Sequence, residues 1–214
     1  MNYFEELINK AKEIENPLKQ VLAVSGSPRK GGNSDIIIKQ IILGLNTENI
    51  ATESTNLKSI DFSGCIGCEK CRKDKICTML LDGMSVLYPS IIDSKGLILV
   101  SPVHNYNITS WMKAFIDRLY CFYEFDNNTR PRKWSSRLAN QNRKVVISAV
   151  CEQENIENLG FAIDAMKRPM EALGFDIIGT LPVFNSFEKG AVKKQKEIMD
   201  KAFELGIKMG RQLK

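Results

Sequence analysis

Residues 21–45, VLAVSGSPRKGGNSDIIIKQIILGL, constrain the fold of this chain more than any other segment. An apolar run rich in β-branched residues stops at Gly26, and apolar residues resume at helical spacing after a loop of small and polar residues. The pattern predicts a strand, a loop and a helix in that order. The loop amides would lie at the positive end of the helix, which favours a phosphate ligand, although an ordinary glycine-rich turn has the same pattern.

The loop sequence limits which phosphate ligand it can bind. A nucleoside triphosphate loop requires Gly-Lys-Ser/Thr, but here Lys30 is followed by Gly31 and Gly32. A dinucleotide loop requires GxGxxG and an acidic residue about 20 positions later. Here Gly26 is followed by Ser27 and Pro28, and Asp61 lies too far along the chain to be that acidic residue. What remains is a single terminal phosphate, as on FMN. Hydroxyl, amide and guanidinium groups could hold it, and the candidates are Ser27, Arg29, Asn33 and Ser34.

Length and composition narrow the class of protein. The 214 residues suffice for one sizeable α/β domain, and 43% hydrophobic residues can build its core. The formal charge of +5 is spread out, without a basic run interleaved with aromatics, which argues against nucleic acid and for an anionic cofactor or an acidic partner. No apolar run is long enough for a membrane span, and the first residues lack a signal core, so we expect a cytoplasmic protein.

Four of the six cysteines lie close together in the sequence. In a cytoplasmic protein they are expected to be reduced thiols, metal ligands or redox groups. Structural zinc sites usually use two separated C-x2-C pairs, whereas three cysteines at successive intervals of three are the spacing of ferredoxin cluster loops. The spacing favours a [4Fe-4S] cluster, and zinc or free thiols remain alternatives. The cysteines are Cys65, Cys68, Cys71 and Cys77.

A second candidate loop follows the apolar run at 97–102, which is typical of a central parallel strand. In an open parallel sheet ligands bind beyond the carboxyl ends of the strands, so we expect this loop to meet the loop at 26–34. Its planar and hydrogen-bonding groups could hold a ring such as isoalloxazine, with the single histidine as a ring-lining group and no side chain predicted as catalytic. The candidates are His104, Asn105, Tyr106 and Asn107.

The rest of the chain alternates strands and helices, which predicts a doubly wound α/β fold with a parallel sheet covered by helices on both faces. We expect residues 1–18 to form a helical extension, with a helix at 3–15 ended by Pro17, and residues 19–214 to form the domain, with a cysteine-rich loop at 61–82. Residues 123–141 are expected to be a long connection. Further strands are predicted at 51–60, 144–150 and 175–183, and further helices at 82–92, 109–120, 156–173 and 190–213.

Together these motifs resemble the iron-sulfur flavoproteins within the flavodoxin-like NADPH-dependent FMN reductase family. The resemblance rests on GSPRKGGNS at 26–34, CIGCEKCRKDKIC at 65–77 and SPVHNYNITSWMKAFIDR at 101–118. It implies a five-stranded sheet, FMN held through its phosphate at the first loop and through its ring at 102–107, a cluster on the four cysteines, and a homodimer or homotetramer. Pro102 and Val103 thereby join the ring candidates. His104, Asn105 and Tyr106 stand where the family usually has tyrosine, another aromatic residue and glycine.

Three functions are compatible with these features. The first is a redox enzyme that passes electrons between a [4Fe-4S] cluster, FMN and a small-molecule or ferredoxin-type partner. The second is an NAD(P)H-dependent reductase of flavins or quinones without a cluster. The third is a flavin electron carrier or redox sensor with no substrate of its own.

Overall fold

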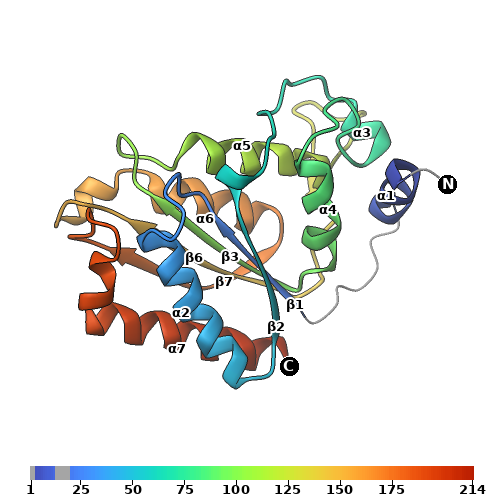
Figure 1. Cartoon of the computed structure of the whole chain (residues 1–214). Helices are drawn as coiled ribbons and strands as arrows, with labels where there is room; N and C mark the ends of the chain where they lie inside the picture. The colour runs from blue at the N-terminus through green and yellow to red at the C-terminus, as the bar shows by residue number, and fades with distance from the viewer. Residues whose placement is uncertain (1–2, 13–19) are drawn as a thin grey trace.

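The computed structural model describes residues 3–12 and 20–214, and its central element is a five-stranded parallel sheet (Figure 1). The spatial order is β2-β1-β3-β6-β7, so the order of strands reverses direction between β1 and β3. In such sheets this reversal opens a crevice at the carboxyl ends of the two strands. The predicted α/β, doubly wound, flavodoxin-like fold is confirmed. The strands are β1 (Gln20–Ser25), β2 (Ala51–Asn56), β3 (Gly96–Pro102), β6 (Arg143–Val150) and β7 (Phe175–Val183).

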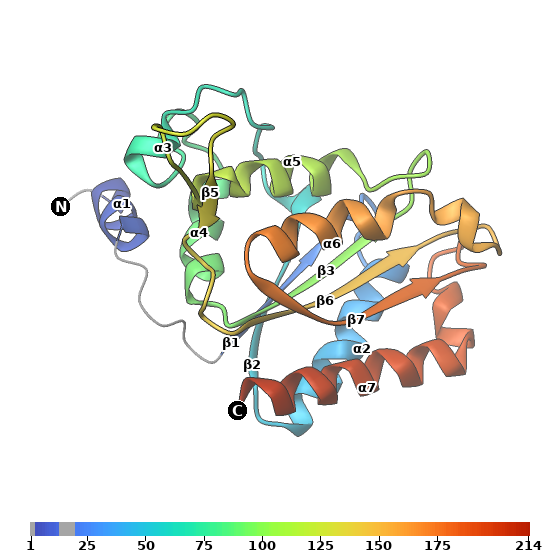
Figure 2. The same cartoon turned by 180° about the vertical axis from the view of Figure 1, so that it is seen from behind.

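Helices cover both faces of the sheet, as predicted (Figures 1 and 2). One face carries α2 (Asn33–Thr47) and α7 (Lys196–Leu213), and the other carries α4 (Met84–Asp93), α5 (Ser110–Arg118) and α6 (Ala162–Ala172). β1, β3 and β6 are buried almost throughout, because each is covered on both sides. The sheet therefore separates two hydrophobic cores.

Two glycines let α2 and α7 cross in close contact. A Cβ atom added at Gly44 would lie 2.1 Å from the Phe203 carbonyl oxygen, and one added at Gly206 would lie 2.0 Å from the Ile41 carbonyl oxygen. Real Cβ atoms do not approach backbone that closely, so the two helix backbones touch only because both side chains are absent.

Several elements end or break earlier than the sequence pattern predicts. The strand expected at 51–60 ends at Asn56, whose side chain accepts a hydrogen bond from the Lys58 amide (2.9 Å) and starts the 3-10 turn η1 (Leu57–Ser59). The helix expected at 156–173 is split at Gly160, where φ is +52°, into the 3-10 turn η3 (Ile156–Leu159) and α6. The helix expected at 190–213 likewise begins with a 3-10 turn, η4 (Ala191–Lys194), before α7.

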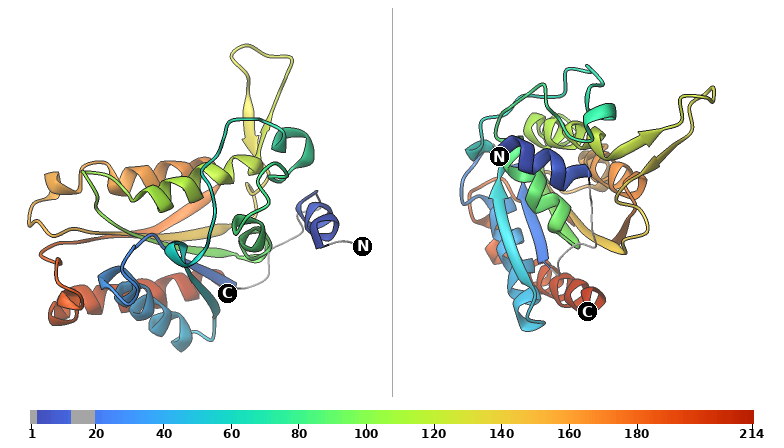
Figure 3. Two further views of the ribbon diagram at one scale, coloured as in Figure 1. Left: turned by 45° about the horizontal axis from the view of Figure 1, so that its top comes forward. Right: turned by 90° about the vertical axis from the view of Figure 1, so that its right-hand side faces the viewer.

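The connection at 123–141 contains an antiparallel hairpin of β4 (Tyr123–Phe125) and β5 (Trp134–Ser136). Figure 3 shows the hairpin projecting away from the sheet and beside α3 (Cys71–Asp74). The Tyr123 and Trp134 rings pack edge to face across the two strands, 5.3 Å between centroids. The long connection predicted at 123–141 therefore contains two short strands that the sequence pattern does not indicate.

The N-terminal helix α1 (Tyr3–Lys12) packs beside α4. The Tyr3 hydroxyl donates to the Ser85 carbonyl oxygen (3.3 Å), Lys10 pairs with Asp93, and Leu7 is buried. The helix is confirmed for residues 3–12, whereas the predicted end at 13–15 and Pro17 lies outside the described residues. Among the helices of the described residues, none has the length and apolar character needed to cross a membrane.

Candidate functional site

The two loops predicted to meet do so at the carboxyl ends of β1 and β3. The Gly26 amide donates to the Val100 carbonyl oxygen (2.8 Å), and the Thr109 hydroxyl donates to the Gly26 carbonyl oxygen (2.8 Å). Thr109 also accepts from the Met112 amide (3.2 Å), so one side chain both caps α5 and fixes the first loop. A Cβ atom at Gly26 would lie 2.9 Å from the Met112 Cβ atom, which is why glycine is required where the loops touch.

Both loops line one pocket, which we call the strand-end pocket, with a volume of about 180 Å³. All four phosphate candidates contribute to it, and so do three of the six ring candidates. The sequence candidates that line the pocket are Ser27, Arg29, Asn33, Ser34, Pro102, Val103 and His104.

The other three ring candidates form a tight turn outside the lining. His104 and Asn107 are joined by two backbone hydrogen bonds of 2.8 and 3.0 Å, with Asn105 (φ +47°) and Tyr106 (φ +60°) between them. Positive φ at both central residues is the type I′ geometry, in which glycine is the usual second residue. The Tyr106 side chain is 62% exposed. Whether Asn105, Tyr106 and Asn107 contact a flavin stays a prediction.

The Asn33 side chain is already committed to a neighbouring loop. Its amide nitrogen donates to the carbonyl oxygens of Ser186 and Glu188, each at 2.9 Å, and its oxygen accepts from the Gly190 amide, also at 2.9 Å. Asn33 is 7% exposed. Its side chain therefore ties the loop after β7 to the start of α2, and the group it offers the pocket is its backbone amide.

That amide belongs to the first turn of α2. The first hydrogen bond of the helix runs from the Ile36 amide to the Gly32 carbonyl oxygen (3.1 Å), so the amides of Asn33 and Ser34 precede the helical ladder. Such amides are the donors that bind anions at helix N-termini. On the other side of the loop, the Asp35 carboxylate accepts a hydrogen bond from the Gly31 amide (2.6 Å). This bond holds the carboxylate away from the amides of Asn33 and Ser34.

The strand-end rule also predicts that residues 149–152, at the carboxyl end of β6, border this crevice, and Val150 and Glu152 line the pocket. Sequence reasoning missed three lining residues, all in the loop after β7. Arg29 rests on one of them: its guanidinium lies 4.9 Å from the centre of the Phe187 ring and donates to the Phe187 carbonyl oxygen (2.9 Å). The strand-end rule that located the first two loops could have located these as well. The missed residues are Ser186, Phe187 and Lys189.

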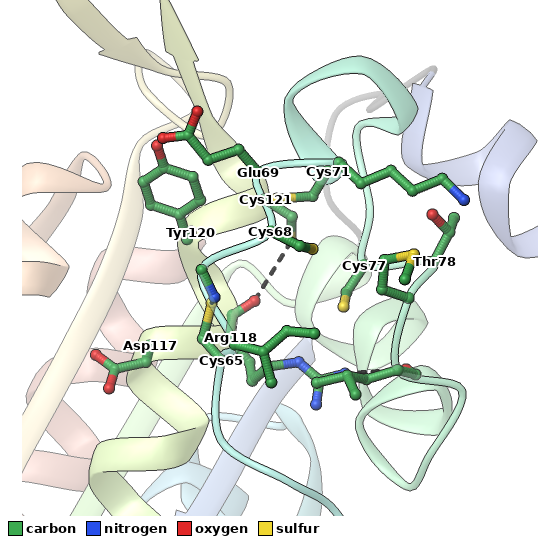
Figure 4. A pocket seen from close by; sticks show the side chains of 15 residues that line it. Cys65, Cys68, Glu69, Cys71, Cys77, Thr78, Asp117, Arg118, Tyr120 and Cys121 are labelled. Atoms are coloured by element: carbon green, nitrogen blue, oxygen red, sulfur yellow. Dashed lines mark hydrogen bonds between the residues drawn. The ribbon is translucent and has the colours of Figure 1, made fainter.

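A second pocket, the cysteine pocket, has a volume of about 240 Å³ and is lined by all four clustered cysteines (Figure 4). Its other walls include the apolar Ile66, Met79 and Leu80. A fifth cysteine, Cys121, also lines it from the 3-10 turn η2 (Leu119–Phe122) and donates through sulfur to the Arg118 carbonyl oxygen (3.5 Å). Cys121 and the sixth cysteine, Cys151, are both buried.

The four predicted ligands differ in exposure. Cys65 and Cys68 are exposed, whereas Cys71 and Cys77 are partly buried. Burial first, and the neighbouring Cys77 second, raise the pKa of the Cys71 thiol to about 11. Over residues 3–12 and 20–214, no three histidine, cysteine or acidic side chains are gathered closely enough to hold a metal ion. The donor set suits an iron-sulfur cluster in kind, because four thiols line one largely apolar pocket.

Arg118, at the end of α5, holds both ends of the segment that carries the cysteines. One terminal nitrogen donates to the Ser63 carbonyl oxygen and to Asp82, each at 2.8 Å, and the other donates to the Leu80 carbonyl oxygen and to Asp82, each at 3.1 Å. Burial alone would raise the pKa of Asp82, but hydrogen bonds from Arg118 and from the Ser63 amide hold this pKa below its ordinary value.

α5 thus connects the two pockets. Thr109 caps its first turn and contacts Gly26 of the loop at 26–34, and Arg118 is its last residue at the cysteine pocket. Nine helical residues correspond to about 13 Å along the helix axis.

The model of the family described as NADPH-dependent FMN reductase matches residues 20–151. The chain belongs to the NADPH-dependent FMN reductase family. The match extends from β1 to the end of β6 and includes both loops of the strand-end pocket and the whole cysteine pocket. The residues of this family member that follow β7 and complete the strand-end pocket lie beyond the matched range.

Distant relatives of this FMN reductase family member carry a more specific name. An iron-sulfur flavoprotein of Methanocaldococcus jannaschii is 29% identical over 99 residues, which are 46% of this chain and 51% of the relative. An iron-sulfur flavoprotein of Archaeoglobus fulgidus is 32% identical over 100 residues, 47% of this chain and 45% of the relative. The aligned stretch therefore spans about half the length of each relative.

Solved structures confirm the fold alone, because sequence identity to them is low. An FMN-dependent NADH-azoreductase from Bacillus anthracis, solved in complex with FMN, superposes with a TM-score of 0.64 at 13% identity, covering 92% of this chain and 99% of the other. A flavodoxin from the domain Archaea superposes with a TM-score of 0.54 at 10% identity, covering 91% and 98%.

Proposed function

We propose that this protein is an FMN-dependent oxidoreductase of the iron-sulfur flavoprotein type, which passes electrons between a [4Fe-4S] cluster, FMN and a redox partner. One observation carries the proposal: the two loops expected to bind a flavin line one pocket, the four cysteines line another, and α5 joins the two. Membership of the FMN reductase family and the names of the distant relatives support the same assignment.

The phosphate of FMN would bind at the first turn of α2. The Asn33 and Ser34 amides donate there at the positive end of the helix, and Ser34 adds a buried hydroxyl. Arg29 and Lys189 line the same pocket and supply positive charge for a dianion.

The ring of FMN would lie against residues 102–104. Pro102, Val103 and His104 line the strand-end pocket, and the Val103 amide donates to the Val150 carbonyl oxygen (2.8 Å), which holds this backbone in place beside β6. Glu152 lies on the same wall. When bound, FMN supplies chemistry that takes up two electrons and releases them singly, and a [4Fe-4S] cluster supplies single-electron transfer.

Cys65, Cys68, Cys71 and Cys77 would hold the cluster against the largely apolar wall of their pocket. Arg118 and Asp82 fix both ends of the segment that carries these thiols. α5 spans about 13 Å from the end of the loop that would hold the flavin ring to the cysteine pocket.

The proposal includes partners. The electron donor or acceptor would be NAD(P)H, another small molecule or a ferredoxin-type protein, and the chain would work as a homodimer or homotetramer. Lys70 and Lys73 are exposed beside the cysteines and suit an acidic protein partner, whereas Arg72 and Lys75 pair with Glu69 and Glu124.

Anaerobic purification followed by a count of iron, sulfide, zinc and FMN per chain tests the proposal. We expect one FMN and about four each of iron and sulfide per chain. Reduced ferredoxin and NADPH are then compared as electron donors. FMN without iron but with rapid NADPH oxidation would replace the proposal with the cluster-free reductase, and FMN with neither donor active would favour the electron carrier. A colourless protein that does not bind added FMN would overturn all three.

A further inference from the structure

Phe187 and Arg29 both line the strand-end pocket, and they lie against each other. The guanidinium carbon of Arg29 is 4.9 Å from the centre of the Phe187 ring, and one terminal nitrogen, Nη1, donates to the Phe187 carbonyl oxygen (2.9 Å). Both residues are exposed. An exposed arginine has many rotamers available, so two contacts with one residue restrict the orientation of this guanidinium.

The contact with Phe187 leaves two nitrogens of Arg29 available. Among the described residues, neither the Nε–H group nor the second terminal nitrogen, Nη2, has an acceptor. These two groups lie on the same edge of the planar guanidinium as parallel donors, which is the geometry that binds two oxygens of a phosphate. Phe187 therefore holds Arg29 without occupying the donors that an anion needs.

The backbone of Phe187 is held in place independently of its ring. The Asn33 side chain donates to the carbonyl oxygens of Ser186 and Glu188, the residues on either side of Phe187, each at 2.9 Å. Loss of the ring would therefore leave the Phe187 carbonyl group in position. The segment also lies beyond residues 20–151, which the family model matches, so membership of the family does not account for the pair.

We propose that Phe187 positions Arg29 to bind the phosphate of the flavin, so that the preference of the strand-end pocket for FMN over riboflavin depends on this pair. The inference rests on the proposed function, in which the anion is the FMN phosphate. A guanidinium that is oriented before the ligand arrives loses less side-chain entropy on binding, which increases affinity. Phe187 acts through Arg29, as a positioning residue.

The test compares FMN and riboflavin binding to the flavin-free F187L variant, measured by flavin fluorescence. Leucine keeps the backbone carbonyl group but has no aromatic face. We expect the dissociation constant of FMN to rise about fivefold, which corresponds to about 1 kcal/mol, and that of riboflavin to change less than about twofold. F187Y keeps the aromatic face, so its affinity for FMN should stay within about twofold of the wild type. Phe187 is 49% exposed, so F187L should fold like the wild type.

F125L is the matched control. The Arg72 guanidinium carbon lies 4.8 Å from the centre of the Phe125 ring, and neither residue lines the strand-end pocket. The same substitution in a similar pair should therefore leave FMN affinity unchanged. A double-mutant cycle shows whether Phe187 acts through the arginine: in an R29M background, F187L should cause no further loss of FMN affinity.

The outcomes separate this inference from the proposed function. Unchanged FMN affinity in F187L would overturn the role of Phe187 and leave the proposed function standing. An equal loss of riboflavin affinity, or a further loss in the R29M background, would mean that the Phe187 ring contacts the flavin itself, and would also overturn the positioning role. A wild-type protein that binds no FMN would overturn the proposed function, and the role of Phe187 with it.

Discussion

At the scale of single residues, Tyr106 occupies a backbone conformation that suits glycine. Its φ of +60° lies in the left-handed region, which costs a side-chain-bearing residue roughly 1–2 kcal/mol. A contact with another segment stabilises this strained conformation, because the Tyr106 carbonyl oxygen accepts a hydrogen bond from the Phe161 amide (2.8 Å). Gly160 makes this approach possible, since a Cβ atom there would lie 2.1 Å from the same oxygen. Strain of this kind concentrates at ligand-binding turns.

We predict that Tyr106→Gly stabilises the protein by about 0.5–1 kcal/mol, because relief of the left-handed strain exceeds the entropy cost of glycine. Urea unfolding of the FMN-free protein measures the change. Asn105→Gly is the matched control within the same turn, and it should have a smaller effect because asparagine tolerates this region. A Tyr106→Gly variant less stable than the wild type would show that packing of the tyrosine ring outweighs the strain.

Asn33 was predicted as a phosphate ligand, but its side chain holds the loop after β7. We predict that Asn33→Ala lowers the free energy of unfolding by about 2–3 kcal/mol even without FMN, because it leaves buried backbone groups at Ser186 and Gly190 unpaired. The neighbouring Ser34→Ala should change stability by less than about 1 kcal/mol. Urea unfolding distinguishes the two, and equal losses would contradict the structural role of Asn33.

At the scale of elements, the contact between α2 and α7 depends on the absence of side chains at two positions. We predict that Gly44→Ala destabilises the protein by about 1–3 kcal/mol, although alanine is the better helix former, because the added Cβ atom would lie 2.1 Å from the Phe203 carbonyl oxygen. Lys39→Ala, on the exposed side of α2, is the control and should be nearly neutral. Thermal unfolding measures both, and a Gly44→Ala variant with raised stability would mean that the helices separate at little cost.

The cysteine-bearing segment is fastened by an ion pair whose strength depends on pH. The pKa of Asp82 lies below its ordinary value of 3.8, so the folded state favours the charged carboxylate. The resulting stability is fully present above pH 3.8 and is lost as the pH falls through the lower pKa of the folded state. We predict that the difference in unfolding free energy between wild type and Asp82→Asn is largest near neutral pH and shrinks below about pH 4. A difference that stays constant from pH 7 to pH 3 would contradict a charged Asp82 in the pair with Arg118.

At the scale of the whole molecule, the sequence predicts long periodic elements well and short local interruptions poorly. Buried strands such as β3 and β6 are recognisable because both faces are covered, and their apolar runs are unbroken. The break at Gly160 and the hairpin at 123–136 depend on contacts with Tyr106 and between Tyr123 and Trp134, which no local pattern records. Phe187 and Lys189 were missed for the same reason: they carry no motif and reach the pocket only through the order of the strands.

The strand-end pocket combines groups from four separate loops, so a ligand that binds there should stabilise the whole molecule. We predict that FMN at about 100 times its dissociation constant raises the free energy of unfolding by about 2.7 kcal/mol. Riboflavin offers the same ring without the phosphate, and at equal concentration it should stabilise far less, because the α2 amides and Arg29 would have no anion to bind. Thermal unfolding of the flavin-free protein with each compound measures the difference. Equal stabilisation by both would mean that the ring alone is recognised, and that the loop at 26–34 is an ordinary turn between a strand and a helix.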